Sequence, residues 1–298
     1  MPRTARIAVA VGLVLAAVVA GGAAAPLRVA ATTSIVGDVV RAIGGDGVTV
    51  TVLLPAGADP HTFEPTPKEM ASLGDVQTIF ANGAGLETFL DSLLASVGVP
   101  IVSVSDGIAF RGFAQGSEEQ GVDPHVWFDP MNVIVWTESI ARQFATLDPA
   151  NAEGYATRAL AYEQELKDLD VWIVEAVAAI PRERRKLVSD HEAFGYFVDR
   201  YGFDDVGTVI PGLSTLAEPS AQGLAALEDA IREHGVPAIF VGVSVNPALA
   251  EQVAQDTGAR IVFLYTGALS GTAGPAGTYL DLMRYDVRTI VQALGGGP

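Results

Sequence analysis

The architecture of this chain of 298 residues follows from residues 151–180, NAEGYATRALAYEQELKDLDVWIVEAVAAI. Apolar side chains recur there in steps of three, four and seven, the spacing of one face of an α-helix. They are Tyr155, Tyr162, Leu166, Leu169, Ile173, Val177 and Ile180. Pro149 and Pro181 lie just outside the two ends, where a residue that cannot continue a helix is expected. We predict one helix of about 30 residues, roughly 45 Å long, with a break into two helices as the alternative.

On both sides of this segment, short β-branched runs alternate with helical stretches. The predicted strands are 27–33, 48–54, 78–81 and 101–104 before it and 186–189, 207–210, 238–241 and 260–264 after it. The predicted helices are 67–73, 87–96 and 131–146 before it and 194–201, 221–234, 248–258 and 279–294 after it. Such alternation is typical of parallel βαβ units. We therefore predict an α/β protein of two lobes, each with a parallel sheet flanked by helices, joined by one long rigid helix.

The N-terminal segment has the pattern of a secretory signal peptide. Arg3 and Arg6 precede an apolar run from Ile7 to Ala20, and small residues follow from Gly21 to Ala25. The apolar run is shorter than the roughly 20 residues of a membrane-spanning helix, which disfavours the alternative of a retained anchor. The predicted division is a signal peptide (1–25), an N-terminal lobe (26–149), a linking helix (150–181) and a C-terminal lobe (182–298).

Composition restricts the partners and the compartment. The chain has 18 Lys and Arg against 35 Asp and Glu, a formal net charge of −17. Nucleic acids and anionic membranes select basic patches, so we expect neither as a partner. Cysteine is absent from the sequence, which excludes disulfides, thiolate metal sites and a lipidated cysteine. We expect a secreted periplasmic protein that is not lipid-anchored, with a monomer as the default state.

Three of the four histidines share a local pattern. His61 and His125 each end an Asp-Pro-His sequence that starts at Asp59 or Asp123, and His191 directly follows an aspartate. All three lie in loops after predicted strands, where ligands bind in α/β folds. Neutral imidazole is the commonest metal ligand, three imidazoles suit Zn²⁺, and a neighbouring carboxylate orients such a ring. The alternative is three unrelated surface or packing histidines.

The fourth histidine has a different context. His234 directly precedes Gly235 at the end of a predicted helix. A basic side chain there complements the helix dipole, and glycine is the usual residue after a helix end. We therefore expect His234 to lie away from any metal.

With these motifs the sequence resembles a known family, the metal-binding receptors of bacterial zinc and manganese ABC importers (the cluster A-I solute-binding proteins). The resemblance spans essentially the whole mature chain and is carried by residues 57–67, 123–130, 191–197 and 279–285. It implies two lobes joined by a rigid helix, with a metal site in the cleft. It also implies that His61 and His125 come from the first lobe and His191 from the second. Some members have Glu at the position of His191 and look manganese-selective, so the third imidazole favours zinc.

The sequence departs from the family pattern at two places. The family usually supplies a fourth ligand, an Asp, where Gly267 stands here. We expect water to complete the coordination, with Asp59 or Glu64 as the alternative. Many zinc receptors also carry a long His-rich acidic loop before the second ligand. The corresponding segment here, residues 112–121, is short and contains no histidine.

These observations predict a high-affinity extracytoplasmic solute-binding protein rather than an enzyme. It would capture a divalent metal, with Zn²⁺ favoured and Mn²⁺ as the alternative, and deliver it to the membrane permease of an ABC importer. A three-histidine zinc hydrolase or hydratase is a competing hypothesis, because catalytic zinc keeps an open position. Neither a His-Glu-x-x-His helix nor a cluster that would position a substrate supports it. An extracellular adhesin is a third hypothesis, for which the sequence has no separate signature.

Overall fold

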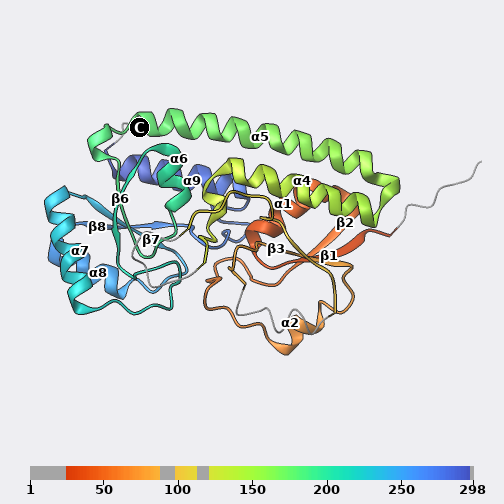
Figure 1. The fold of residues 1–298 in the computed structure, drawn as a ribbon, viewed down its shortest axis with the longest axis horizontal. Coiled ribbons are helices and arrows are strands. Elements are labelled where there is room, and N and C mark those ends of the chain that lie inside the picture. Colours follow the sequence, from red (N-terminus) through yellow and green to blue (C-terminus); the bar gives the residue numbers. More distant parts are fainter. Residues whose placement is uncertain (1–24, 88–97, 113–120, 296–298) are drawn as a thin grey trace, which may run out of the picture.

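The computed structural model describes residues 25–87, 98–112 and 121–295, and it has two lobes that each contain a parallel sheet (Figure 1). The first sheet has the strand order β2-β1-β3-β4 and the second β6-β5-β7-β8. The first sheet consists of β1 (Leu27–Ala31), β2 (Val48–Val52), β3 (Thr78–Ala81) and β4 (Ile101–Ser103). The second consists of β5 (Lys186–Ser189), β6 (Asp204–Thr208), β7 (Ala238–Gly242) and β8 (Arg260–Leu264). The predicted α/β fold of two lobes is confirmed.

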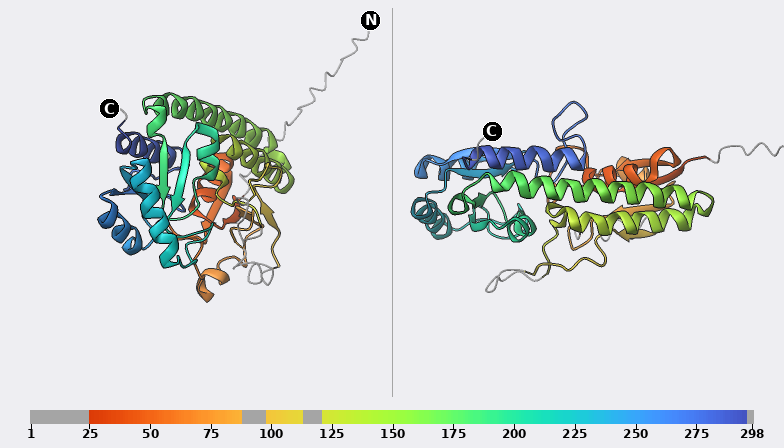
Figure 2. Two further views of the ribbon diagram at one scale, coloured as in Figure 1. Left: turned by 60° about the vertical axis from the view of Figure 1, so that its left-hand side comes forward. Right: turned by 90° about the horizontal axis from the view of Figure 1, so that it is seen from above.

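The long helix is continuous and runs along both lobes (Figure 1). Helix α5 (Ala152–Ala178) has 27 residues and no break, so the alternative of two shorter helices is wrong. Its buried residues include all the predicted apolar positions within these bounds, from Tyr155 to Val177. Figure 2, seen from above, shows α4 (Pro130–Leu147) and α9 (Tyr279–Ala293) on either side of α5. The spine of the molecule is therefore a packed layer of three helices.

One hydrophobic core connects the two lobes through this layer. It includes Val29 and Phe80 of the first sheet, Leu166 of α5, and Leu187 and Phe240 of the second sheet. Because a close-packed core resists sliding, the lobes are coupled along α5 rather than hinged freely.

The C-terminal helix α9 also ties the second lobe to the first. The Tyr279 amide donates a 2.8 Å hydrogen bond to Asp38, which lies in helix α1 (Ser34–Gly44) of the first lobe. The Tyr279 hydroxyl donates a 2.6 Å hydrogen bond to the Trp127 carbonyl. These bonds anchor the start of α9 beside the first sheet.

The helices that flank the sheets agree with the prediction, apart from α1 and from small differences at the ends of the others. They are α2 (Pro67–Ala71), α6 (Gly195–Tyr201), α7 (Ala221–His234) and α8 (Ala248–Thr257), together with α1, α4 and α9. The predicted helix at 87–96 lies, apart from its first residue, outside the described residues. Among the residues that the structure describes, no helix combines the length and the apolar character needed to cross a membrane.

Two elements differ from the prediction. Helix α1 was not predicted, because its sequence is rich in Val and Ile and contains glycines, both weak helix formers. Gly37 is there for close packing, since a Cβ on it would lie 2.6 Å from Val52 Cγ2. Strand β6 begins at Asp204 rather than Gly207. It is an edge strand whose first two residues are exposed aspartates, so hydrophobicity does not mark its start.

Candidate metal centre

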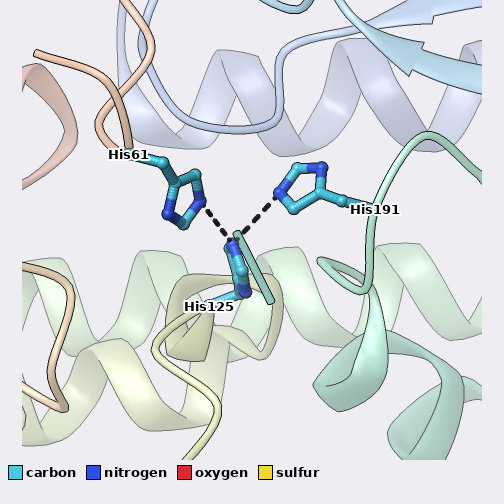
Figure 3. A group of neighbouring side chains, drawn as sticks. All are labelled: His61, His125 and His191. Atoms are coloured by element: carbon cyan, nitrogen blue, oxygen red, sulfur yellow. Dashed lines mark hydrogen bonds between the residues drawn. The ribbon is translucent and has the colours of Figure 1, made fainter. Parts of the chain in front are cut away.

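The three predicted imidazoles meet at one point between the lobes (Figure 3). The Nε2 atom of His125 lies 3.2 Å from Nε2 of His61 and 3.3 Å from Nε2 of His191. The ligand atoms of all three lie within 4.8 Å of one another. His125 and His191 are buried, and His61 is half-buried. Residues separated by 64 and 66 positions in the sequence are thus brought together by the fold.

Each histidine comes from a different loop. His61 lies between β2 and α2 of the first lobe. His125 directly precedes the buried turn Val126–Phe128, which leads into α4. His191 follows β5 of the second lobe by two residues. The centre therefore combines two side chains from the first lobe with one from the second.

The repeated Asp-Pro-His sequence forms the same turn twice. Oδ1 of Asp59 accepts the backbone N–H of His61, and Oδ1 of Asp123 accepts that of His125, both at 2.9 Å. Asp side chains favour turns of this kind, in which they bond to the backbone two residues on. Proline at the middle position restricts the backbone further. The sequence therefore holds both histidines in stiff local turns.

Two of the rings are also oriented by carboxylates. Nδ1 of His125 lies 2.9 Å from Oδ1 of Asp123, and Nδ1 of His191 lies 2.8 Å from Oδ1 of Asp190. A carboxylate at Nδ1 keeps the ring proton there and leaves the Nε2 lone pair free for a cation. Among the described residues, no carboxylate lies at Nδ1 of His61, because Asp59 accepts the backbone N–H of His61 and does not bond to its ring. The expectation that a neighbouring carboxylate orients each ring is thus met by two of the three histidines.

The surroundings lower the pKa of two of the imidazoles, those of His61 and His125. Burial, and then the charges of His125 and His191, lowers the pKa of His61 to about 2. Burial also lowers the pKa of His125, although Asp123 opposes this shift. A neutral imidazole is the form that binds a metal, so both shifts favour the binding-competent form of His61 and His125.

Buried carboxylates beside the rings favour a cation at this point. Asp123 and Asp190 are 1% and 2% exposed. Asp123 is paired with the Arg111 guanidinium at 3.3 Å, whereas Oδ2 of Asp190 accepts the N–H of Gly242 at 2.7 Å. Buried charges require compensation, and a divalent ion held by the three Nε2 atoms would supply it.

The spacing of the nitrogens fits a single ion. Zinc–nitrogen bonds of about 2.0–2.1 Å in tetrahedral geometry place two ligand nitrogens about 3.3 Å apart. The separations of His125 Nε2 from the Nε2 atoms of His61 and His191, 3.2 and 3.3 Å, agree with this value. The three residues present therefore fit a small divalent cation.

No carboxylate of the described residues joins the three histidines in this cluster. Asp59 is engaged by the His61 amide and by the Thr215 hydroxyl, and Glu64 is exposed. At Gly267, a Cβ atom would lie 2.5 Å from Cδ of Pro60. The proline ring thus occupies the space that a side chain at position 267 would need.

Other residues at the site were not singled out from the sequence. The ring of Trp127 lies 5.3 Å from that of His125, and its Nε1 donates to the Thr266 carbonyl at 3.1 Å. Arg111 and Thr215 contact the aspartates that hold the histidines. No local pattern marks Thr215, because its partner Asp59 lies 156 positions away in the sequence. His234 lies exposed at the end of α7, outside the cluster.

Comparisons with known proteins place this geometry in context. The model of the family described as zinc-uptake complex component A, periplasmic, matches residues 29–293. The manganese-binding lipoprotein MntA of Halalkalibacterium halodurans is 36% identical over 270 residues, which cover 90% of this chain and 88% of that protein. The iron-binding protein YfeA of Yersinia pestis is 32% identical over 270 residues, which cover 90% of this chain and 86% of that protein.

A solved structure is also similar to this chain. The periplasmic zinc binding protein TroA from Treponema pallidum has a TM-score of 0.84 and 29% identity. The match covers 91% of this chain and 99% of that chain. The three similar proteins are named for three different metals, manganese, iron and zinc.

Proposed function

Since the chain belongs to the family of the periplasmic zinc-uptake component A and is a metal-binding substrate-binding protein of ABC importers, we propose that its cargo is Zn²⁺. His61, His125 and His191 hold the ion through Nε2. The observation that carries this proposal is the convergence of three imidazoles in a cluster that no carboxylate of the described residues joins. The bound ion is then delivered to the membrane permease of the importer.

The preference for zinc over manganese rests on the type of donor atom. Imidazole nitrogens suit zinc, whereas carboxylate and water oxygens suit manganese. The cluster contains three nitrogens, and the space at Gly267 is filled by Pro60. Water completes the coordination in this proposal. Manganese is the alternative cargo, since several relatives are named for manganese.

The family consists of transport receptors, so the chain is not an enzyme and the hydrolase hypothesis is wrong. The buried position of His125 and His191 suits retention of an ion rather than access by an organic substrate. The formal net charge of −17 favours the approach of cations to the protein.

We further propose that residues 1–25 are a signal peptide and that the mature protein works in the periplasm. Its parts would be an N-terminal lobe (26–149), a linking helix (150–181) and a C-terminal lobe (182–298). Several relatives are named lipoproteins, which conflicts with a protein free of a lipid anchor. The absence of cysteine from this sequence nevertheless supports a protein without a lipid anchor, and we propose a monomer as the default state. Fractionation and the intact mass of the mature chain test this point.

Competitive titration tests the choice of metal. Metal-free protein is titrated with Zn²⁺ and with Mn²⁺, separately and in competition, and binding is followed by calorimetry. The expected result is one site per chain with zinc bound more tightly than manganese. Tighter binding of manganese would reverse the choice of cargo, and binding of neither ion would refute the proposed function.

A further inference from the structure

The three histidines differ in how firmly their own lobe holds them. His125 leads into a fully buried turn and α4, and His191 follows a buried strand. The loop of residues 55–65, which carries His61, is instead exposed or half-buried throughout, except for Pro60. His61 is therefore the ligand candidate whose position depends most on contacts from outside its loop.

Phe63 packs this loop against a hydrophobic cluster of the first lobe, whereas the contacts around Asp59 and Pro60 come from the second lobe. The Gly57 N–H donates to the Leu269 carbonyl at 3.1 Å, and the Thr215 hydroxyl donates to Oδ2 of Asp59 at 2.7 Å. Pro60 packs against Gly267, where only the absence of a side chain leaves room for it. Apart from the His61–His125 contact, the described residues show no other hydrogen bond from this loop to the rest of the chain.

We propose that Thr215 is a positioning residue for His61 and acts as a latch across the cleft. Its hydroxyl holds one oxygen of Asp59, and the other oxygen of Asp59 accepts the His61 amide at 2.9 Å. The chain of contacts from Thr215 through Asp59 to His61 thus joins the second lobe to a first-lobe ligand. This inference rests on the proposed function, in which His61 binds the ion.

The latch acts on release rather than on capture. His125 and His191 are oriented by their own aspartates, so they receive the ion without the help of Thr215. His61 completes the site only while its loop is held against the second lobe. When the Thr215 hydroxyl is lost, the loop opens more often and the ion leaves faster, whereas the rate of capture stays the same.

The contacts of Thr215 favour this role over a structural one. Thr215 is half-buried in the segment between β6 and α7. Its hydroxyl bonds to Asp59, 156 positions away, and to no other group among the described residues. Removal of the hydroxyl should therefore leave the second lobe intact.

The matched pair Thr215→Val and Thr215→Ser tests the latch. Valine keeps the shape and loses the hydroxyl, while serine keeps the hydroxyl. Zn²⁺-loaded protein is mixed with excess chelator in a stopped-flow instrument, and association is measured separately with Zn²⁺. Loss of a hydrogen bond to a charged group predicts about tenfold faster release from Thr215→Val. Association should change by less than about twofold, and Thr215→Ser should release zinc like the wild type.

A second pair of variants, made in His61→Ala protein, distinguishes positioning of His61 from a general destabilisation of the protein. In His61→Ala protein, Thr215→Val should no longer accelerate zinc release, because the ligand that it positions is gone. The melting temperature of the metal-free protein should differ between Thr215→Val and wild type by no more than about 4 °C, the shift expected from one lost hydrogen bond. Unchanged release from Thr215→Val, or equal acceleration with and without His61, would refute the latch.

The outcomes for latch and function are distinguishable. If wild-type protein binds zinc and Thr215→Val releases it at the wild-type rate, the latch is wrong and the proposed function stands. If wild-type protein binds only Mn²⁺, the same measurements are made with Mn²⁺ and the choice of cargo alone is wrong. If it binds neither ion, the proposed function and the latch both fail.

Discussion

A single oxygen, Oδ1 of Asp123, lies 2.9 Å from both the backbone nitrogen and the ring Nδ1 of His125. The other carboxylate oxygen lies 3.3 Å from the Arg111 guanidinium, which in turn binds Asp199 of the second lobe at 2.6 Å. Asp123 therefore orients a proposed metal ligand and contacts a group that crosses to the other lobe.

Replacing Asp123 by Asn should weaken zinc binding by about 10- to 100-fold, because the imidazole loses the carboxylate that orients it and raises its basicity. The zinc dissociation constant from competition with a chelator measures the effect. Asp199→Asn is the matched control, since it breaks an Arg111 contact but leaves the partner of His125 in place. Wild-type affinity in Asp123→Asn would contradict the role of this carboxylate.

Alanine at His61, His125 or His191 should lower zinc affinity by at least about tenfold in each case, a loss of roughly 1.4 kcal/mol. Each substitution removes one of the three converging nitrogens. Calorimetric titration of the three variants measures this loss. His234→Ala should bind zinc like the wild type, because His234 lies exposed at the end of α7. An unchanged affinity in one variant would remove that residue from the site.

A methyl group at Gly267 should accelerate zinc release. A Cβ atom there would lie 2.5 Å from Pro60 Cδ, so the loop that carries His61 must move away. We expect Gly267→Ala to release zinc several-fold faster in the chelator experiment, an effect of roughly 1 kcal/mol. Gly271→Ala is the control, since a Cβ there meets nothing within 4 Å. Equal rates for both variants would show that the packing of Pro60 on Gly267 does not hold the site closed.

Asp286 should make the protein less stable as the pH rises. Burial raises the pKa of this carboxyl well above its usual value, and its Oδ2 atom has no hydrogen-bond partner among the described residues. A pKa that is higher in the folded than in the unfolded state contributes stability below about pH 3.8, and this contribution is lost as the pH rises toward the folded-state value.

The variant Asp286→Asn should not lose stability in this way as the pH rises, because an amide does not ionise. The free energy of unfolding of this variant minus that of the wild type should increase with pH, by up to about 1.4 kcal/mol per pH unit above pH 3.8. Urea unfolding of both proteins without metal, at pH 5 and pH 8, measures the difference. A constant difference at the two pH values would mean that Asp286 titrates normally.

Local patterns predicted most of the elements because their signals lie within one segment. The apolar spacing of residues 151–180 predicted α5, and the predicted bounds of β3, β5, β8 and α7 agree with the structure. Helix α1 was missed because close packing of Gly37 on Val52 outweighs its poor helix propensity. Such tertiary contacts have no local signal.

The amino-acid sequence alone determined the spine helix, the two Asp-Pro-His turns and the three histidines as metal-ligand candidates, because helix periodicity and turn chemistry depend on neighbouring residues. The tertiary structure decided that the rings converge, that Pro60 fills the space beside Gly267, and that Thr215 reaches Asp59. These contacts join segments up to about 200 residues apart. Only the packing of two lobes along one helix brings such segments within hydrogen-bonding distance.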